Sequence, residues 1–187
     1  MAHRVCPCWL GYFLINPLRR LGQNPRKILG PYLGEGMTAL EPGPGLGYFT
    51  LEMARLVGST GRVVAVDLQK KMVEGLRRRA AKAGLAERIE CRLAGEGSLE
   101  LSNYAGRADF VLVFAVAHEV PDQRRFLGEL ASAMKPGGRL LLAEPKGHVS
   151  QADFAETLRL AAQAGLRVQS EPEISGSRTA LLVMGSR

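Results

Sequence analysis

Three glycines stand close together in the segment LEPGPGLGYFT, which runs from residue 40 to residue 50. They occupy positions 43, 45 and 47, between a short apolar run and a segment whose apolar residues have helical spacing. Glycine allows a sharp turn and lets a ligand approach the main chain closely. The segment therefore predicts either a ligand-binding loop or a simple tight turn, and the neighbouring residues must decide between the two.

An acidic residue follows this loop at the end of the next apolar run. Asp67 closes the run GRVVAVD and lies 20 residues after Gly47. Sites where a carboxylate binds a ribose diol typically have this order of elements: a strand, a glycine loop, a helix and a second strand that ends in an acidic residue. Dinucleotides and S-adenosylmethionine both use such sites. Dinucleotide sites normally carry the spacing G-x-G-x-x-G, whereas the spacing here is G-x-G-x-G.

Histidines and acids gather around the ends of two later apolar runs. His118 and Glu119 follow ADFVLVFAV, while Glu144, Lys146 and His148 lie at and just beyond the end of RLLLAEP. An unperturbed imidazole titrates at about pH 6.5 and can accept a proton at neutral pH. We therefore expect His118 to be a general base, with His148 as the second candidate. Two alternatives stay open: these histidines cap a helix or bind a loop, or they hold a metal ion together with Glu144, which their spacing does not require.

The elements that must position these residues alternate along the chain. Apolar runs without alternation predict strands buried on both faces, and the segments between them predict helices, which together favour a parallel sheet covered on both sides. Asn24 and Pro25 can start a helix, and Ser150 with Asp153 forms a capping-box pattern. The expected strands are 37–40, 61–67, 88–93, 108–116, 139–145, 166–171 and 179–185, and the expected helices are 48–58, 71–84, 121–134 and 150–164.

Composition is consistent with one globular domain. The chain has 187 residues, of which 46% are hydrophobic and 23% are charged, enough to bury a full core. No apolar run approaches the roughly 20 residues that a membrane-spanning helix needs. The segment CWLGYFLI at 8–15 has the length of a signal-peptide core, but no small-residue cleavage site follows it. We therefore expect a cytoplasmic protein.

The cysteines and the net charge are less decisive. Three cysteines, Cys6, Cys8 and Cys91, are too few for a disulfide framework and fit a reducing compartment. Cys6, Cys8 and His3 could form a soft-metal or thiol-reactive site, but they fall short of four zinc ligands, so ordinary reduced thiols are expected. The net charge of +7 suits an anionic ligand or a nucleic acid, although the basic residues are scattered.

Taken in order, five segments carry a resemblance to a known family. They resemble the successive motifs of class I S-adenosylmethionine-dependent methyltransferases, especially those that act on small molecules. The segments are ALEPGPGLGYFT, VVAVDLQKKM, ADFVLVFAVAHEVPD, MKPGGRLLLAEP and the final pair of strands. The resemblance covers residues 25 to 187. It implies a Rossmann-like, doubly wound α/β fold whose seven-stranded sheet has an antiparallel last strand.

The resemblance also implies a set of cofactor-binding residues. The glycines would surround the methionine and ribose parts of S-adenosylmethionine, Asp67 would accept hydrogen bonds from the ribose hydroxyls, and Leu68 would flank the adenine. Family members often carry an acid right after the third strand; the segment here reads Ala94-Gly95-Glu96, so the register of Glu96 is open. The implied set is Glu41, Gly43, Gly45, Gly47, Asp67, Leu68, Glu96 and Phe114, with no metal.

These observations lead to one main hypothesis and three alternatives. Residues 31–187 are expected to form the S-adenosylmethionine-binding domain, and residues 1–30 an arm that lies over the site as a lid or packs on the sheet edge. The main hypothesis is methyl transfer to a small molecule. The alternatives are an RNA-modifying enzyme, favoured only by the basic isoelectric point, a non-catalytic protein that binds S-adenosylmethionine, and a nicotinamide oxidoreductase, against which the glycine spacing argues.

Overall fold

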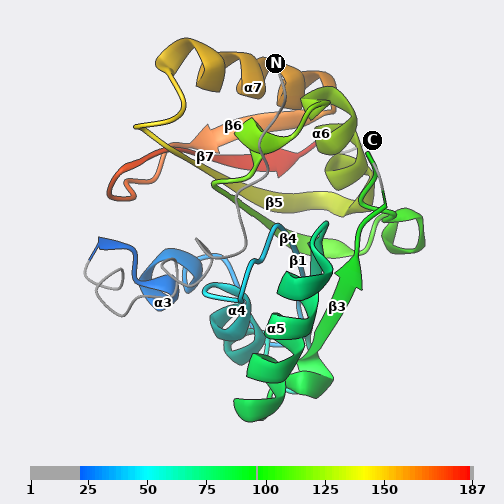
Figure 1. Cartoon of the computed structure of the whole chain (residues 1–187). Helices are drawn as coiled ribbons and strands as arrows, with labels where there is room; N and C mark the ends of the chain where they lie inside the picture. Colours follow the sequence, from blue (N-terminus) through cyan, green and yellow to red (C-terminus); the bar gives the residue numbers. More distant parts are fainter. Residues whose placement is uncertain (1–21, 96, 186–187) are drawn as a thin grey trace.

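A single seven-stranded sheet organises the molecule (Figure 1). The computed structural model describes residues 22–95 and 97–185. The strand order is β3-β2-β1-β4-β5-β7-β6, and every neighbouring pair is parallel except the two pairs that include β7. The strands are β1 (Thr38–Pro42), β2 (Arg62–Asp67), β3 (Ile89–Leu93), β4 (Ala108–Phe114), β5 (Met134–Pro145), β6 (Leu166–Ser170) and β7 (Ser177–Met184). The expected doubly wound fold with an antiparallel last strand is confirmed.

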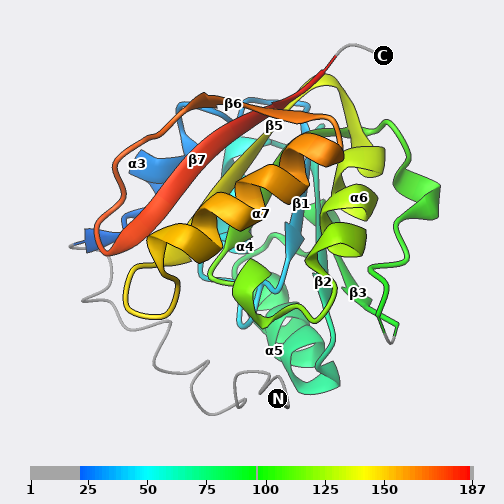
Figure 2. The same ribbon diagram turned by 90° about the horizontal axis from the view of Figure 1, so that it is seen from above.

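Helices cover both faces of this sheet, which gives three layers (Figures 1 and 2). Of the α-helices in the described residues, the first three along the chain cover one face and the last two cover the other. The α-helices are α3 (Pro25–Leu29), α4 (Thr50–Leu56), α5 (Lys70–Lys82), α6 (Gln123–Ala133) and α7 (Gln151–Gln163), and the short 3-10 helices are η1 (Ala86–Arg88), η2 (Ser102–Tyr104) and η3 (Ala117–Glu119). Within the described chain, no helix combines the length and apolarity that crossing a bilayer requires.

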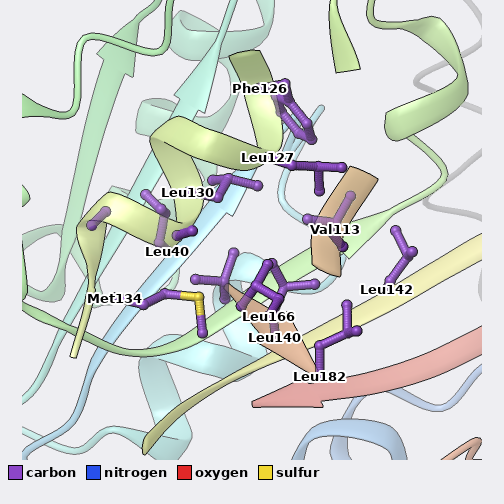
Figure 3. Close-up of a cluster of buried hydrophobic side chains, with 14 of the residues drawn as sticks. Leu40, Val113, Phe126, Leu127, Leu130, Met134, Leu140, Leu142, Leu166 and Leu182 are labelled. Carbon is purple, nitrogen blue, oxygen red and sulfur yellow. The ribbon is translucent and has the colours of Figure 1, made fainter. Parts of the chain in front are cut away.

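The apolar runs of the sequence explain the layers, because successive residues of a strand point to opposite faces. In β2, Val64 and Val66 join the cluster under α6 and α7, whereas Val63 and Ala65 join the cluster under α3, α4 and α5. Figure 3 shows the first of these clusters, in which side chains of α6 such as Leu127 pack on strand side chains. Each central strand is therefore buried twice, as its lack of alternation predicts.

Most predicted boundaries agree with the structure to within two or three residues, and β5 shows the largest difference. Lys135 to Gly138 were expected to form a turn before the strand, but β5 includes them. The pairing of β5 with β4 is irregular at these residues, because its register shifts between Ala108 and Phe110. Gly137 has a φ of +74° there, which a glycine adopts readily.

The predicted helix starts are confirmed at two places and shifted at a third. The Asn24 side chain accepts hydrogen bonds from the first turn of α3, and Ser150 forms a complete capping box with Asp153. The helix expected to begin at Pro121 begins instead at Gln123, because the Asp122 side chain accepts the N–H of Arg125 and caps it. These caps satisfy donors that a helix start leaves unpaired.

Candidate active site

A cavity of about 720 Å³ opens at the carboxyl ends of the parallel strands. Strand order reverses between β1 and β4, and ligands of open α/β sheets bind in the crevice that such a reversal creates. Nearly all the described residues that the sequence singled out as site residues line this cavity: Glu41, Gly43, Gly45, Asp67, Leu68, Phe114, His118 and His148. Gly47 lies beside the cavity without lining it, and Glu96 lies outside the described residues, as do Cys6, Cys8 and His3.

Each glycine of the loop after β1 is required for a different reason. All three have positive φ values, +63° at Gly43, +53° at Gly45 and +82° at Gly47. A Cβ at Gly43 would come within 2.5 Å of Cγ2 of Val116, and one at Gly47 would collide with Leu76 of α5. A Cβ at Gly45 would meet nothing within 4 Å, and Gly45 lines the cavity. Gly45 is thus the glycine of the loop that has open space beside its main chain.

Asp67 ties the glycine loop to the end of β2. One carboxylate oxygen, Oδ1, accepts the N–H of Gln69 at 2.8 Å, and the other, Oδ2, accepts the N–H of Gly45 at 3.3 Å. The residue is only 8% exposed, and burial raises its pKa above the ordinary value of 3.8, against the opposing effect of these two hydrogen bonds. An ionised carboxylate has about four acceptor sites, so Asp67 can accept two further donors from a ligand.

The start of α4 is fixed to the end of β1 by a buried pair. The Thr50 hydroxyl donates to Oε2 of Glu41 at 2.5 Å, and both side chains are buried. The loop is therefore held at both ends, by Glu41 on the β1 side and by Asp67 on the β2 side. Such fixing lowers the cost of ordering the loop when a ligand binds.

His118 is oriented by Glu144, which comes from the neighbouring strand β5. The imidazole Nδ1 is hydrogen-bonded to Oε2 of Glu144, a carboxylate that is 1% exposed. The same carboxylate accepts the N–H groups of Val116, Ala117 and His118, at 3.1, 3.0 and 3.3 Å. This arrangement leaves Nε2 as the ring nitrogen for a ligand, and the hydrogen bond that the ring donates to Glu144 raises the pKa of His118 above 6.5.

The turn that carries His118 contains a strained residue. Ala115 has a φ of +55°, which is rare for a residue with a side chain. The strand expected to extend to residue 116 therefore ends at Phe114. Glu144 stabilises this turn by accepting the three N–H groups that follow it. Nothing in the sequence indicates either the strain or the contact with Glu144, because alanine does not favour this conformation.

His148 occupies a more exposed position than His118. The two imidazole rings lie 5.9 Å apart between centroids and are nearly perpendicular, with an angle of 72°. The side chain of His118 is 22% exposed, whereas His148 belongs to an exposed turn after β5. Among the described residues, no group of three or more His, Cys, Asp and Glu side chains has an arrangement that could hold a metal ion.

The lining residues fit the cofactor that the sequence implied. A volume of about 720 Å³ falls in the range of about 300–1,000 Å³ that is usual for small-molecule sites. Three features of the lining match a nucleoside with a ribose diol. They are the open space at Gly45, the spare acceptor sites of Asp67 and the apolar side chain of Leu68, which is 56% exposed. When bound, S-adenosylmethionine supplies an activated methyl group on a sulfonium.

Comparison with known proteins agrees with this fit. Residues 33–173 match the family model described as a methyltransferase domain. The chain is 36% identical over 119 residues to a protein-L-isoaspartate O-methyltransferase from Methanothrix thermoacetophila, covering 64% of this chain and 51% of the relative. It is 30% identical over 109 residues to a ubiquinone/menaquinone biosynthesis C-methyltransferase from Klebsiella pneumoniae, covering 58% of this chain and 43% of the relative. The chain thus spans about half the length of these curated relatives.

A solved structure is similar over nearly the whole chain. It is an S-adenosylmethionine-dependent methyltransferase from Aquifex aeolicus, with a TM-score of 0.85 and 26% identity over 97% of this chain and 100% of that one. The family uses S-adenosylmethionine as its cofactor. With the family model, the sheet topology and the glycine loop in agreement, the chain belongs to the class I S-adenosylmethionine-dependent methyltransferases.

Proposed function

We propose that this protein transfers the methyl group of S-adenosylmethionine to a small-molecule acceptor, with His118 as general base. The observation that carries the proposal is the position of His118 on the wall of the cavity that the glycine loop and Asp67 also line. The hydrogen bond that Nδ1 donates to Glu144 fixes the ring and leaves Nε2 for the acceptor. A positioned general base assists methyl transfer to a hydroxyl or an amine by taking up the acceptor proton.

The chain contributes mainly positioning and proton transfer. Bound S-adenosylmethionine would supply the methyl group as an activated sulfonium. Nε2 of His118 would take up the proton that the acceptor gives off. Asp67 would hold the ribose, and Gly45 would let the cofactor lie against the main chain. Holding the two reactants in line supplies much of the acceleration, and the apolar walls exclude water.

His118 is the better supported of the two histidine candidates. Its ring is held by a buried carboxylate, whereas His148 lies in an exposed turn with no such hydrogen bond of its ring among the described residues. A fixed tautomer and orientation favour catalysis. We assign His148 to the wall of the acceptor site, beside His118, with which it makes an edge-on ring contact.

The segment at the start of the described chain supports an acceptor site at the same end of the cavity. Gln23 lines the cavity, accepts a hydrogen bond from the Tyr48 hydroxyl on its carbonyl at 2.9 Å, and donates from Nε2 to the carbonyl of Ser175 at 3.1 Å. We propose that residues 22–30, the described part of the predicted lid of residues 1–30, bound the acceptor site. Residues 1–21 lie outside the described residues.

Calorimetry of the purified protein with S-adenosylmethionine, S-adenosylhomocysteine and NADH is the first test. We expect the two adenosyl ligands to bind and NADH not to bind. Methyl transfer is then measured with S-adenosylmethionine labelled in the methyl group, over a panel of small hydroxyl and amine compounds. Binding without transfer to any member would favour a non-catalytic protein, and transfer only to RNA would replace the small-molecule assignment.

A variant of His118 tests its role. His118→Gln should lower kcat by about 100-fold or more, the usual contribution of a general base, and leave the Kd of S-adenosylmethionine nearly unchanged. His148→Gln is the matched control, and we expect it to change KM more than kcat. An unaltered kcat in His118→Gln at saturating acceptor would remove the residue from the catalytic role.

A further inference from the structure

Basic side chains that are scattered along the sequence gather on one face of the fold. Helices α3, α4 and α5 lie together on one side of the sheet (Figure 1) and carry nine basic and two acidic side chains, a net charge of +7. Helices α6 and α7, on the other side, carry three basic and three acidic side chains, which cancel. The net charge of the described α-helices therefore lies on the face that α3, α4 and α5 cover.

Helix α5 contributes most of this charge and turns it toward solvent. Its apolar side chains, among them Met72, Val73 and Leu76, are buried. Residues three, four or seven apart share one side of an α-helix, and at 1.5 Å per residue the basic residues extend over about 18 Å. We call the exposed basic residues of this helix the basic stripe: Lys70, Lys71, Arg77, Arg78 and Lys82.

Most of the basic stripe has no acidic partner. Among the described residues, Lys70 is the only member of the stripe that forms an ion pair, with its Nζ 4.0 Å from Oε1 of Glu74. Residues 1–21, which lie outside the described chain, contain no aspartate or glutamate, and Glu96 is the only acidic side chain that the structure leaves undescribed. At least three of the five positive charges are therefore unpaired.

These unpaired charges favour a polyanion as the ligand of this face. Like charges one turn apart on a helix, such as those of Arg78 and Lys82, lower the stability of the helix. A polyanion that lies along α5 removes this repulsion and releases counterions from its own charges. Along one strand of a duplex the phosphates follow one another at about 3.4 Å of axial rise, so about five of them match the length of the basic stripe.

A nucleic acid matches the basic stripe better than an anionic membrane does. Helices that bind membrane surfaces insert an apolar side into the lipid, but the apolar side of α5 is buried in the protein. The large apolar side chains that are exposed in the described chain, Leu68, Leu93 and Val168, all lie outside α3, α4 and α5. Contact by charge alone, along a line, is typical of binding to a phosphate backbone.

We propose that the face formed by α3, α4 and α5 binds nucleic acid through its phosphate backbone, with the basic stripe of α5 as the main contact. Such contacts position a protein on a nucleic acid and do not read its sequence. The inference goes beyond the proposed methyl transfer and does not rest on it, because no residue of the basic stripe lines the cavity.

Fluorescence anisotropy with two labelled probes tests the binding. The probes are an oligouridine of about 20 nucleotides and a DNA duplex of about 20 base pairs, titrated with the protein over about 50–200 mM potassium chloride. We expect the logarithm of the affinity to fall linearly with the logarithm of the salt concentration, with a slope of about −2 or steeper for the better probe. Absence of binding to both probes at the lowest salt concentration would overturn the inference.

Two double variants locate the binding surface. Arg78→Gln combined with Lys82→Gln should weaken binding by about tenfold or more and make the salt slope shallower by about 1.4–1.8, because each phosphate contact contributes about 0.7–0.9. Arg124→Gln combined with Arg167→Gln is the matched control, since it removes the same charge from exposed positions outside α3, α4 and α5. Thermal melts check that both variants are folded. Equal affinity of the two double variants would refute the role of the basic stripe.

Vesicles that contain phosphatidylserine distinguish a membrane from a nucleic acid. If the protein sediments with these vesicles but binds neither probe, and the Arg78→Gln and Lys82→Gln variant loses this sedimentation, the face binds lipid and the inference is wrong. Its failure is distinct from that of the proposed function. If S-adenosylmethionine does not bind while the basic stripe still controls the affinity for a probe, the proposed function is wrong and the inference holds.

Discussion

Replacing Asp67 by asparagine isolates the contribution of its charge to cofactor binding. Two of the about four acceptor sites of the carboxylate are taken by the N–H groups of Gln69 and Gly45. The remaining two can accept ribose hydroxyls. Asparagine has one acceptor oxygen, so at least one hydrogen bond to a charged acceptor is lost. Such a bond contributes about 1.5–3 kcal/mol, and we expect the Kd to rise by about 10- to 150-fold.

Stability should respond in the opposite sense to binding. Burial raises the pKa of Asp67, which means that the fold disfavours its charged form despite the two backbone hydrogen bonds. Removing the charge therefore removes a cost, which offsets the backbone hydrogen bond that the single acceptor oxygen of asparagine cannot keep. Asp67→Asn should therefore unfold at a temperature no lower than the wild type. Loss of affinity without loss of thermal stability separates a missing contact with the ligand from a collapsed loop.

Calorimetry with both adenosyl ligands is the assay. S-adenosylmethionine and S-adenosylhomocysteine carry the same ribose, so Asp67→Asn should weaken both by the same factor. The affinity of the wild type should also fall on acidification, through a pH above the ordinary aspartate value of 3.8, because the raised pKa brings protonation to a higher pH. Unchanged affinity in Asp67→Asn would show that the ribose does not lie at Asp67 and that the glycine loop is only a turn.

The remaining predictions concern the base, the loop and a helix cap. Glu144 raises the pKa of His118, and the base must be neutral to act, so kcat/KM should rise with pH through a midpoint above 6.5. Glu144→Gln should lower the pH of this midpoint. An unchanged midpoint in Glu144→Gln would mean that another group causes the rise of kcat/KM with pH. Gly45→Ala should abolish most cofactor binding and lower the free energy of unfolding by about 1–2 kcal/mol. Gly47→Ala should lower the free energy of unfolding further, because its Cβ collides with Leu76. Calorimetry measures binding by the two variants, and thermal melts measure their stability. Ser150→Ala should lower the free energy of unfolding by about 1 kcal/mol in urea titrations, since it removes the cap of α7.

Much of the fold could be predicted because its signals are local. A run such as VVAV in β2 is apolar at every position, and only a strand buried on both faces requires that. The capping box of Ser150 and Asp153 involves only residues within four consecutive positions, so the local sequence predicts it. The irregular start of β5 could not be predicted, because it depends on how this strand pairs with β4, from which α6 separates it in the chain.

The sequence predicted residues that the structure places around one cavity, but it could not predict the contacts between them. The sequence brings His118 and Glu144 to the ends of two strands, but their hydrogen bond depends on β4 and β5 being neighbours in the sheet. Gly47 was grouped with the other glycines as a cofactor contact, a role that stays a prediction; its packing against Leu76 depends on how α5 lies on the loop.

The net charge of the chain did not predict the charged side chains of the cavity, for a related reason. The sum over the chain is +7, which suits an anion, but the described cavity walls contain acids and no lysine or arginine. A sum does not show where charges lie. For a ligand enclosed by protein, the nearest side chains outweigh distant surface charges, which salt screens over about 10 Å.

The direction of β7 has a practical consequence. Because β7 runs antiparallel to β5, its last residues lie beside the beginning of β5, where Val183 pairs with Arg139. The described chain therefore ends at the edge of the sheet opposite to the cavity, while Gln23 lies at the cavity itself. An affinity tag, a fluorescent reporter or an attachment to a sensor surface placed after residue 185 would leave the entrance accessible, whereas the same addition just before residue 22 would stand at that entrance.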